Sequence, residues 1–278
     1  MRLYFGYGSN LDFDDWSKWC KKNNASPDGL SELKRAFLPG YSINYSHYSS
    51  GRKGGAANII ATGNLSVGVY GVLFEVNHEC QLSLDDKEGH PNHYHQIEVS
   101  VIGENGETIS AVTYISTKYD LGSFFPPTDN YHQLVDSGLH RRRMPTRFIQ
   151  AARENFDTSD SGYIIAYGTL KRGQSRERIM PGEYVCNGIV NGKLYDLGPF
   201  PGLVEGDMAV SCEVYFCDTM NSSIEYLDQI EGADLVPPLY EKKITPVECD
   251  DGKLRFGICY FYCGDTTDQD IIENGVWQ

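Results

Sequence analysis

A short apolar strand that runs into a glycine loop occurs twice in this chain, and the repeat constrains the fold more than any other feature. The first copy is Tyr4–Asn10 and the second is Tyr163–Leu170. Each predicts a buried strand that ends in a tight turn. Because Gly6 and Gly8 lack a Cβ atom, the first loop can bend sharply or let a ligand approach the backbone. Its amide groups, at the start of a helix, would bind a small anion such as a carboxylate.

Other features follow each loop in the same order. Strands come first, then a short helix ending in Asp-x-x-Glu-Gly, at Asp85–Gly89 and again at Asp228–Gly232. A hairpin comes next in both halves, with Asn105-Gly106 and Asp251-Gly252 as its turn signals. Two unrelated domains would rarely share this succession, so the sequence predicts a tandem duplication.

A length of 278 residues leaves room for two ordinary domains. The stretch Asn155–Ser161 is short, polar and acidic, which is typical of a linker. We therefore expect a first domain over 1–154, a linker over 155–162 and a second domain over 163–278.

Composition excludes several function classes. A formal net charge of −14 disfavours binding to nucleic acid or to an anionic membrane. The run Arg141–Arg143 is the basic cluster of the sequence, and we interpret it as a solvated helix end. The eight cysteines form no CxxC pair and no zinc-finger spacing, and neither a signal peptide nor a membrane-spanning segment is evident. We expect reduced thiols and a cytoplasmic protein.

Local helices can be predicted in the first half. Residues 12–22 indicate an amphipathic helix with Phe13, Trp16 and Trp19 as its apolar stripe. A second helix should begin after the cap Asn77, with Leu82 and Leu84 facing inward.

Two glutamates, Glu88 and Glu231, are predicted at helix C-termini in apolar surroundings. The helix dipole and desolvation would both raise the pKa of a carboxyl there, which suits a general base near neutral pH. A surface glutamate before a C-cap glycine is the ordinary alternative. Two copies, each opposite a Tyr-Gly-Ser/Thr loop, favour a catalytic role.

At this point the residues resemble a known family. The motifs of the first half are Tyr4–Leu11, Gly54–Ala57, Leu84–Gly89 followed by Tyr94, and Pro126-Pro127 followed by Tyr131. Together they resemble γ-glutamylcyclotransferases over residues 2–154. The second half is similar to the γ-glutamylamine cyclotransferase and AIG2-like branch over 163–277, through Ala166–Gly173, Leu194–Gly202 and the terminal Gly275-x-Trp277. The tandem form resembles bacterial two-domain members.

The resemblance implies an α+β fold with two copies of a mixed β-barrel and flanking helices. It also implies a reaction without a cofactor, in which the α-amine of a small γ-glutamyl compound attacks its own γ-carbonyl, releasing 5-oxoproline and an amine. Glu88 and Glu231 would be the catalytic acid–bases. Substrate binding would involve the loop residues Tyr7, Gly8, Ser9 and Asn10, their counterparts Tyr167, Gly168, Thr169 and Leu170, and the pocket tyrosines Tyr94, Tyr131 and Tyr240.

The second half departs from the first in two respects. Thr169-Leu170 replaces Ser-Asn, and Tyr131 has no counterpart. Three alternatives to this enzyme stay open. His90, His93 and His95 lie beside Glu88 and could indicate a metal hydrolase, although Pro91 breaks helical ligand spacing. One or both domains could bind a γ-glutamyl or carboxylate ligand, or a protein partner, without turnover. A thiol-dependent enzyme is the third alternative, but no cysteine stands beside a base in the sequence. The oligomeric state does not follow from the sequence.

Overall fold

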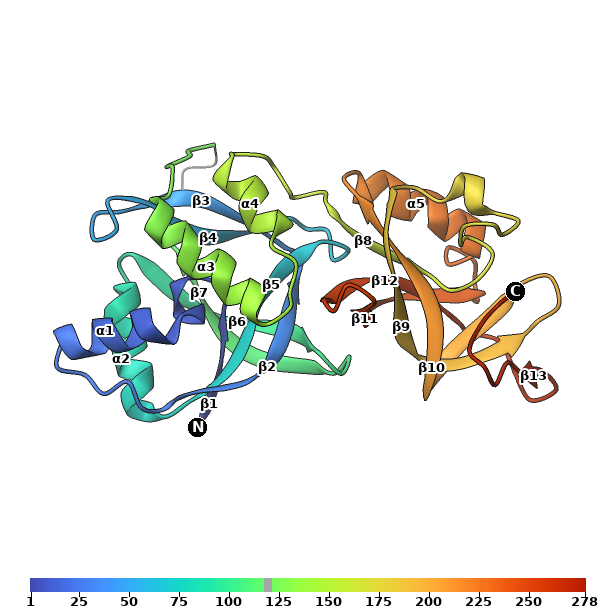
Figure 1. Cartoon of the computed structure of the whole chain (residues 1–278), viewed down its shortest axis with the longest axis horizontal. Helices are drawn as coiled ribbons and strands as arrows, with labels where there is room; N and C mark the ends of the chain where they lie inside the picture. Colours follow the sequence, from blue (N-terminus) through green and yellow to red (C-terminus); the bar gives the residue numbers. More distant parts are fainter. Residues whose placement is uncertain (118–121) are drawn as a thin grey trace. The chain divides into compact units, whose positions relative to one another are not determined.

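The computed structural model describes residues 1–117 and 122–278 and divides the chain into two compact units, Met1–Ser159 and Asp160–Gln278 (Figure 1). Over the described part of the chain, no helix is long and apolar enough to cross a membrane.

The first unit is built on a closed barrel of five strands. Their order around the barrel is β1 (Arg2–Gly6), β5 (Gly68–Val76), β2 (Leu30–Pro39), β6 (Tyr94–Gly103) and β7 (Thr108–Ser116). Neighbours are antiparallel except for the pair that closes the barrel, in which Tyr4 of β1 lies beside Val112 of β7 in parallel.

Helices and a separate hairpin flank this barrel (Figure 1). The helices are η1 (Ser9–Leu11), α1 (Phe13–Lys22), α2 (His78–Glu88), α3 (Asp129–Arg141) and α4 (Arg147–Arg153), and the hairpin consists of β3 (Tyr41–Ser49) and β4 (Gly54–Ala61). Helix α4 packs on β3, and α3 packs on η1. The hairpin and α3 thereby stand beside the loop that leaves β1.

The second unit repeats the strand order of the first. Its barrel runs β8 (Gly162–Ala166), β10 (Pro201–Cys217), β9 (Glu183–Asp196), β11 (Tyr240–Cys249) and β12 (Leu254–Tyr262), with β13 (Asp270–Ile271) on β9. A parallel pair closes it too, through Ile164 and Ile258. The helices described here are η2 (Glu177–Ile179) and α5 (Met220–Glu231). The expected α+β fold, with two mixed barrels and flanking helices, is confirmed.

Two sequence expectations about buried side chains were wrong. Phe13 is 54% exposed and Leu82 is 55% exposed. In α1 the buried residues are Trp16 and Cys20. Phe13 lies on the same side of the helix as Trp16, three residues on, but it is the first helical residue and its side chain stays exposed. Leu82 stands two positions before the buried Leu84, and residues two apart on a helix do not share a face.

The C-terminal ends of α2 and α5 determine where the two glutamates lie. Gly89 and Gly232 adopt the left-handed conformation, with φ of 64° and 63°, which ends α2 and α5 immediately after Glu88 and Glu231. Asn77 caps the other end of α2, because its side chain accepts a hydrogen bond from the Cys80 amide. Each glutamate is therefore the last residue of its helix.

Candidate active site

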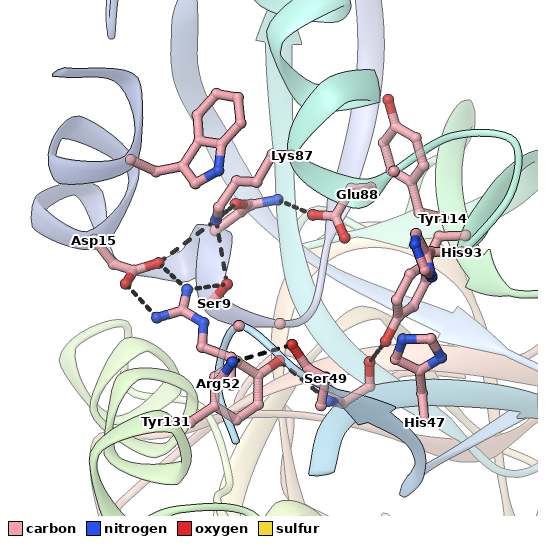
Figure 2. Close-up of a pocket in the computed structure, with 18 of the residues that line it drawn as sticks. Ser9, Asp15, His47, Ser49, Arg52, Lys87, Glu88, His93, Tyr114 and Tyr131 are labelled. Carbon is pink, nitrogen blue, oxygen red and sulfur yellow. Dashed lines mark hydrogen bonds and ion pairs between the residues drawn. The ribbon is translucent and has the colours of Figure 1, made fainter. Parts of the chain in front are cut away.

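The first unit holds a cavity of about 550 Å³ beside the loop that follows β1 (Figure 2). Its walls come from this loop, the end of α2, one face of α1 and the β3–β4 hairpin. All the site residues predicted for the first half line it: Tyr7, Gly8, Ser9, Asn10, Glu88, Tyr94 and Tyr131. The fold thus gathers residues that are far apart in the sequence.

Asn10 connects the loop to the glutamate. Its Nδ2 donates to Oε1 of Glu88 at 2.9 Å and to the Tyr4 hydroxyl oxygen at 2.9 Å. Asn10 is almost fully buried, so its amide occupies one fixed place. One carboxylate oxygen of Glu88 is held by this contact.

The pKa of Glu88 is raised above its ordinary value, and desolvation in the pocket is the main cause. Lys87, the Asn10 hydrogen bond and Arg52 act in the opposite direction by stabilising the ionised form. The net environment favours a carboxyl that takes up and returns a proton more readily than a surface glutamate does.

A charged cluster that sequence reasoning missed lies next to this pair. The ammonium of Lys87 donates to Ser9 Oγ at 3.2 Å and to Asn10 Oδ1, and it lies 3.5 Å from a carboxylate oxygen of Asp15. The guanidinium of Arg52 binds the two oxygens of Asp15 at 2.7 and 2.6 Å (Figure 2). The pKa of Asp15 is lowered, because the hydrogen bond from Arg52 and the charge of Lys87 outweigh its desolvation.

Tyr94 and Tyr131 hold one backbone position of β4 between them. The Tyr94 hydroxyl donates to the carbonyl of Ala57 at 3.0 Å, and the Tyr131 hydroxyl accepts from the amide of Ala57 at 3.1 Å. The pKa values of both tyrosines are raised, mainly by burial, so both hydroxyls remain protonated at neutral pH. Because its oxygen accepts from Ala57, the Tyr131 hydroxyl can still donate to a ligand.

The loop that lines the cavity also carries backbone donors. Among the residues that the structure describes, the amides of Gly8, Ser9 and Asn10 have no hydrogen-bond acceptor, whereas those of Leu11 and Asp12 bond back to Gly8 and Ser9. Such amides can bind a carboxylate or polarise a carbonyl oxygen.

The second unit repeats the framework of the site. The Tyr7 hydroxyl donates to the Tyr114 carbonyl at 2.6 Å, and the Tyr114 hydroxyl donates to Asp85 at 2.6 Å. In the second unit, Tyr167 donates to the Tyr260 carbonyl at 2.7 Å, and Tyr260 donates to Asp228 at 2.8 Å. In both units these two successive hydrogen bonds connect the loop after the first strand to the helix that carries the glutamate.

The pocket of the second unit is much smaller, about 30 Å³. It is lined by all the residues predicted for that half, namely Tyr167, Gly168, Thr169, Leu170, Glu231 and Tyr240. The Tyr240 hydroxyl donates to the Pro201 carbonyl at 2.7 Å, as Tyr94 does to Ala57. Pro201 and Phe200 therefore stand where the first unit has two alanines, and their bulk narrows the pocket.

Glu231 has a simpler environment than Glu88. Burial raises the pKa of its carboxyl, and the charge of Arg176 opposes this shift. Within the described part of the chain, no side chain donates a hydrogen bond to Glu231. The residue before it is Ile230, and Leu170 takes the place of Asn10.

Over residues 1–117 and 122–278, which the structure describes, the histidines do not gather into a metal site. His93 lines the large cavity and His47, which the sequence did not single out, packs 4.6 Å from the Tyr94 ring. In the described residues, the one group of three metal-binding side chains is Cys186, Cys249 and Asp251 in the second unit. Asp251 there is engaged by two hydrogen bonds from Arg255, whose positive charge opposes a cation.

Both halves of the chain are similar to known proteins. The model of the family "Gamma-glutamyl cyclotransferase, AIG2-like" matches residues 164–278, and that of the "AIG2-like family" matches residues 68–151. A Vibrio cholerae protein that carries a gamma-glutamylcyclotransferase name is 30% identical over 119 residues, 41% of this chain and 93% of that protein. The human protein named gamma-glutamylcyclotransferase is 26% identical over 147 residues, 52% of this chain and 74% of its own length.

Solved structures are similar as well. One titled "Gamma-glutamyl cyclotransferase" has a TM-score of 0.46 at 25% identity, and the match covers 55% of this chain and 86% of the other chain. YkqA from Bacillus subtilis has a TM-score of 0.33 at 15% identity, and the match covers 95% of this chain and 84% of the YkqA chain.

Proposed function

Because the chain belongs to the AIG2-like gamma-glutamyl cyclotransferase family, we propose that its large pocket cyclises a small γ-glutamyl compound to 5-oxoproline and releases an amine. The observation that carries this proposal is Glu88, a carboxyl of raised pKa that faces a loop of unpaired backbone amides across one cavity.

The loop would hold the γ-glutamyl end. A γ-glutamyl compound carries an α-carboxylate and an amide carbonyl, and both accept hydrogen bonds. The amides of Gly8, Ser9 and Asn10 supply donors on one wall, and the Tyr131 hydroxyl can supply another. Donors fixed in advance stabilise the charge that develops on the carbonyl oxygen during attack.

Glu88 would move the proton. Its carboxylate takes a proton from the substrate's α-ammonium group, and the resulting amine attacks the γ-carbonyl carbon. The new C–N bond closes the five-membered ring, and the attacking nitrogen gives up a second proton to solvent to become the ring amide. The old amide C–N bond breaks, the leaving nitrogen receives the proton from Glu88, and the released amine takes up a proton from solvent. The carboxylate is thereby restored, so one residue serves as base and then as acid.

Holding the substrate folded accounts for much of the acceleration. The attacking nitrogen and the carbonyl carbon belong to one molecule, so the cavity needs to select the conformer in which they meet. A volume of about 550 Å³ leaves room for a leaving amine beyond the γ-glutamyl group.

In the second unit, Glu231 and the loop Tyr167–Leu170 would form a related site for a smaller ligand. The same framework of hydrogen bonds supports this assignment. The narrow pocket leads us to assign most turnover to the first unit.

The test is a panel of γ-glutamyl amino acids, γ-glutamyl amines and glutathione, with products identified by mass spectrometry. We expect at least one compound to give 5-oxoproline and free amine in equal amounts. Glutamate as the product would indicate hydrolysis and contradict cyclisation. Binding of γ-glutamyl compounds without any product would support the non-catalytic alternative.

A further inference from the structure

Lys87 is a buried lysine whose role the proton transfers above do not explain. Its side chain is 6% exposed, although it precedes the catalytic carboxyl at the end of α2. Figure 2 shows the ammonium turned away from Glu88, toward Asp15 and Ser9. Its partners there are the Ser9 hydroxyl, the Asn10 side-chain oxygen and the Asp15 carboxylate.

The contact with Asn10 has a directional consequence. An ammonium group only donates hydrogen bonds, so it selects the oxygen of the asparagine amide and not its nitrogen. With Oδ1 of Asn10 held by Lys87, the NH₂ group must point the other way. It meets Oε1 of Glu88 and the Tyr4 hydroxyl, both at 2.9 Å.

Resting on the proposed role of Glu88, we propose that Lys87 is a positioning residue. Lys87 fixes the Asn10 amide, Asn10 holds Oε1 of Glu88, and the second carboxylate oxygen is left to exchange the proton with the substrate. If the amide turned over, its oxygen would face the carboxylate, and two acceptors would repel each other.

The repeat supplies a natural comparison. Ile230 takes the place of Lys87 and Leu170 takes the place of Asn10, so neither part of this contact exists in the second unit. The two residues are replaced together by apolar side chains. That is the pattern expected if each is useful only in the presence of the other.

Lys87 also lines the cavity, so a direct contact with substrate is the competing explanation. The two explanations differ in how Lys87 and Asn10 combine. If Lys87 acts through Asn10, replacing Lys87 has no further effect on the rate once Asn10 has been replaced. If Lys87 binds substrate, replacing it lowers the rate with or without Asn10.

The first experiment is a double-mutant cycle with Lys87→Met and Asn10→Leu, assayed for 5-oxoproline release. We expect Lys87→Met to lower kcat about 10- to 100-fold, the effect of one hydrogen bond to a charged group, with KM nearly unchanged. The double variant should lose no more than the worse single variant. Lys87→Arg should recover part of the rate, because arginine also only donates. Lys21→Met removes an exposed lysine of α1 outside the cavity and is the matched control.

Losses that multiply in the double variant, or a rise in KM at constant kcat, would overturn the positioning role in favour of substrate contact. If Lys87→Met does not fold, as judged by circular dichroism, Lys87→Gln takes its place in the cycle. Glutamine is neutral but can still donate to Asn10, so we expect a smaller loss with the same non-additivity.

A second measurement does not depend on turnover. The Glu88 carboxyl can be titrated by ¹³C NMR, with Glu88→Gln identifying its signal. The charged groups that act on it electrostatically are Lys87 on α2, Asp15 on α1 and Arg52 in the β3–β4 turn, and the buried hydroxyls of Tyr4, Tyr7, Tyr94 and Tyr131 lie around it. We expect Lys87→Met to raise the pKa of Glu88 and Lys21→Met to leave it in place. An unchanged titration in Lys87→Met would contradict the positioning role. If the wild-type protein forms no 5-oxoproline, the proposed function fails, and the titration still tests the role of Lys87. A rise in the pKa of Glu88 that is as large in the Asn10→Leu background as in the wild type would show that Lys87 acts by its charge alone and would contradict the positioning role.

Discussion

Asn10 donates a hydrogen bond from Nδ2 to Oε1 of Glu88 across 2.9 Å, joining the loop after β1 to the last residue of α2. The loop follows the first strand, and Glu88 lies 78 residues after Asn10 in the sequence. Each element is ordinary by itself, a glycine turn and a helix with a C-cap glycine. Their contact makes a site, because it brings backbone donors and a carboxyl of raised pKa to the same cavity.

The two units should differ in activity. We expect Glu231→Gln to change 5-oxoproline release by less than about twofold, because the pocket of about 30 Å³ in the second unit has little room for a γ-glutamyl compound. The check is kcat/KM for the best substrate of the panel. A loss as large as that of Glu88→Gln would show that the second unit carries turnover.

The pH profile should reflect the raised pKa of Glu88. The base form is needed for attack, so activity should fall as the pH is lowered through this pKa, above the ordinary 4.5 of a glutamate. Lys87→Met removes a cation that favours the ionised form, so its acid limb should move to higher pH. The measurement is kcat/KM against pH for both proteins, and an acid limb at or below the ordinary glutamate value would contradict it.

Arg52 should control substrate affinity. Its guanidinium ties the β3–β4 turn to Asp15 on α1 and lies 5.3 Å from the centre of the Tyr131 ring. We expect Arg52→Met to raise KM about 3- to 10-fold at nearly constant kcat, since a half-exposed ion pair contributes roughly 1 kcal/mol. Lys53→Met removes the same charge from the next, exposed residue and should leave KM unchanged. Equal effects of the two variants would contradict a specific role for Arg52.

Gly55 should be intolerant of a side chain. A Cβ atom there would collide with the carbonyl oxygen of Phe125, in the segment that leads to Tyr131. We expect Gly55→Ala to lower the free energy of unfolding by about 1–3 kcal/mol, the usual cost of overpacking. Gly51→Ala is the control, because its nearest neighbour would be Ser49 Oγ at 3.9 Å. Urea unfolding of both variants checks the difference, and equal stabilities would contradict the close packing.

Local signals explain why much of this site could be predicted from sequence. The glycine loops, the C-caps Gly89 and Gly232 and the glutamates before them are all written in short stretches. Thr128 likewise caps the start of α3, where its side chain accepts a hydrogen bond from the Tyr131 amide. Such features depend on backbone conformation within one or two turns, so they can be predicted without knowledge of the tertiary fold.

The charged cluster could not be predicted in the same way. Asp15 reads as an ordinary acid in the first turn of a helix, and Lys87 as an ordinary base in the last turn. Arg52 lies in a glycine-rich turn. Only the folded barrel brings the three together. The position of Lys87, directly before Glu88, was the one available signal, but a lysine in the last turn of a helix is usually explained by its favourable interaction with the helix dipole.

The difference in volume between the two pockets could not be predicted from the sequence either. The sequence contains Ala56-Ala57 in one half and Phe200-Pro201 in the other, but the segments lie in different elements, β4 and the turn that begins β10. Their equivalence becomes visible through the hydroxyls of Tyr94 and Tyr240, which bond to Ala57 and Pro201. Sequence alone gives no reason to compare them.

The most direct test of the central proposal is 5-oxoproline release by Glu88→Gln, measured with the best substrate of the panel. We expect the folded variant to lose about 100- to 10,000-fold in kcat, the range of general acid–base catalysis. Glu79→Gln, an exposed position on the same helix, should keep the wild-type rate. A Glu88→Gln protein that releases 5-oxoproline at the wild-type rate, also with Glu231→Gln added, would contradict the mechanism.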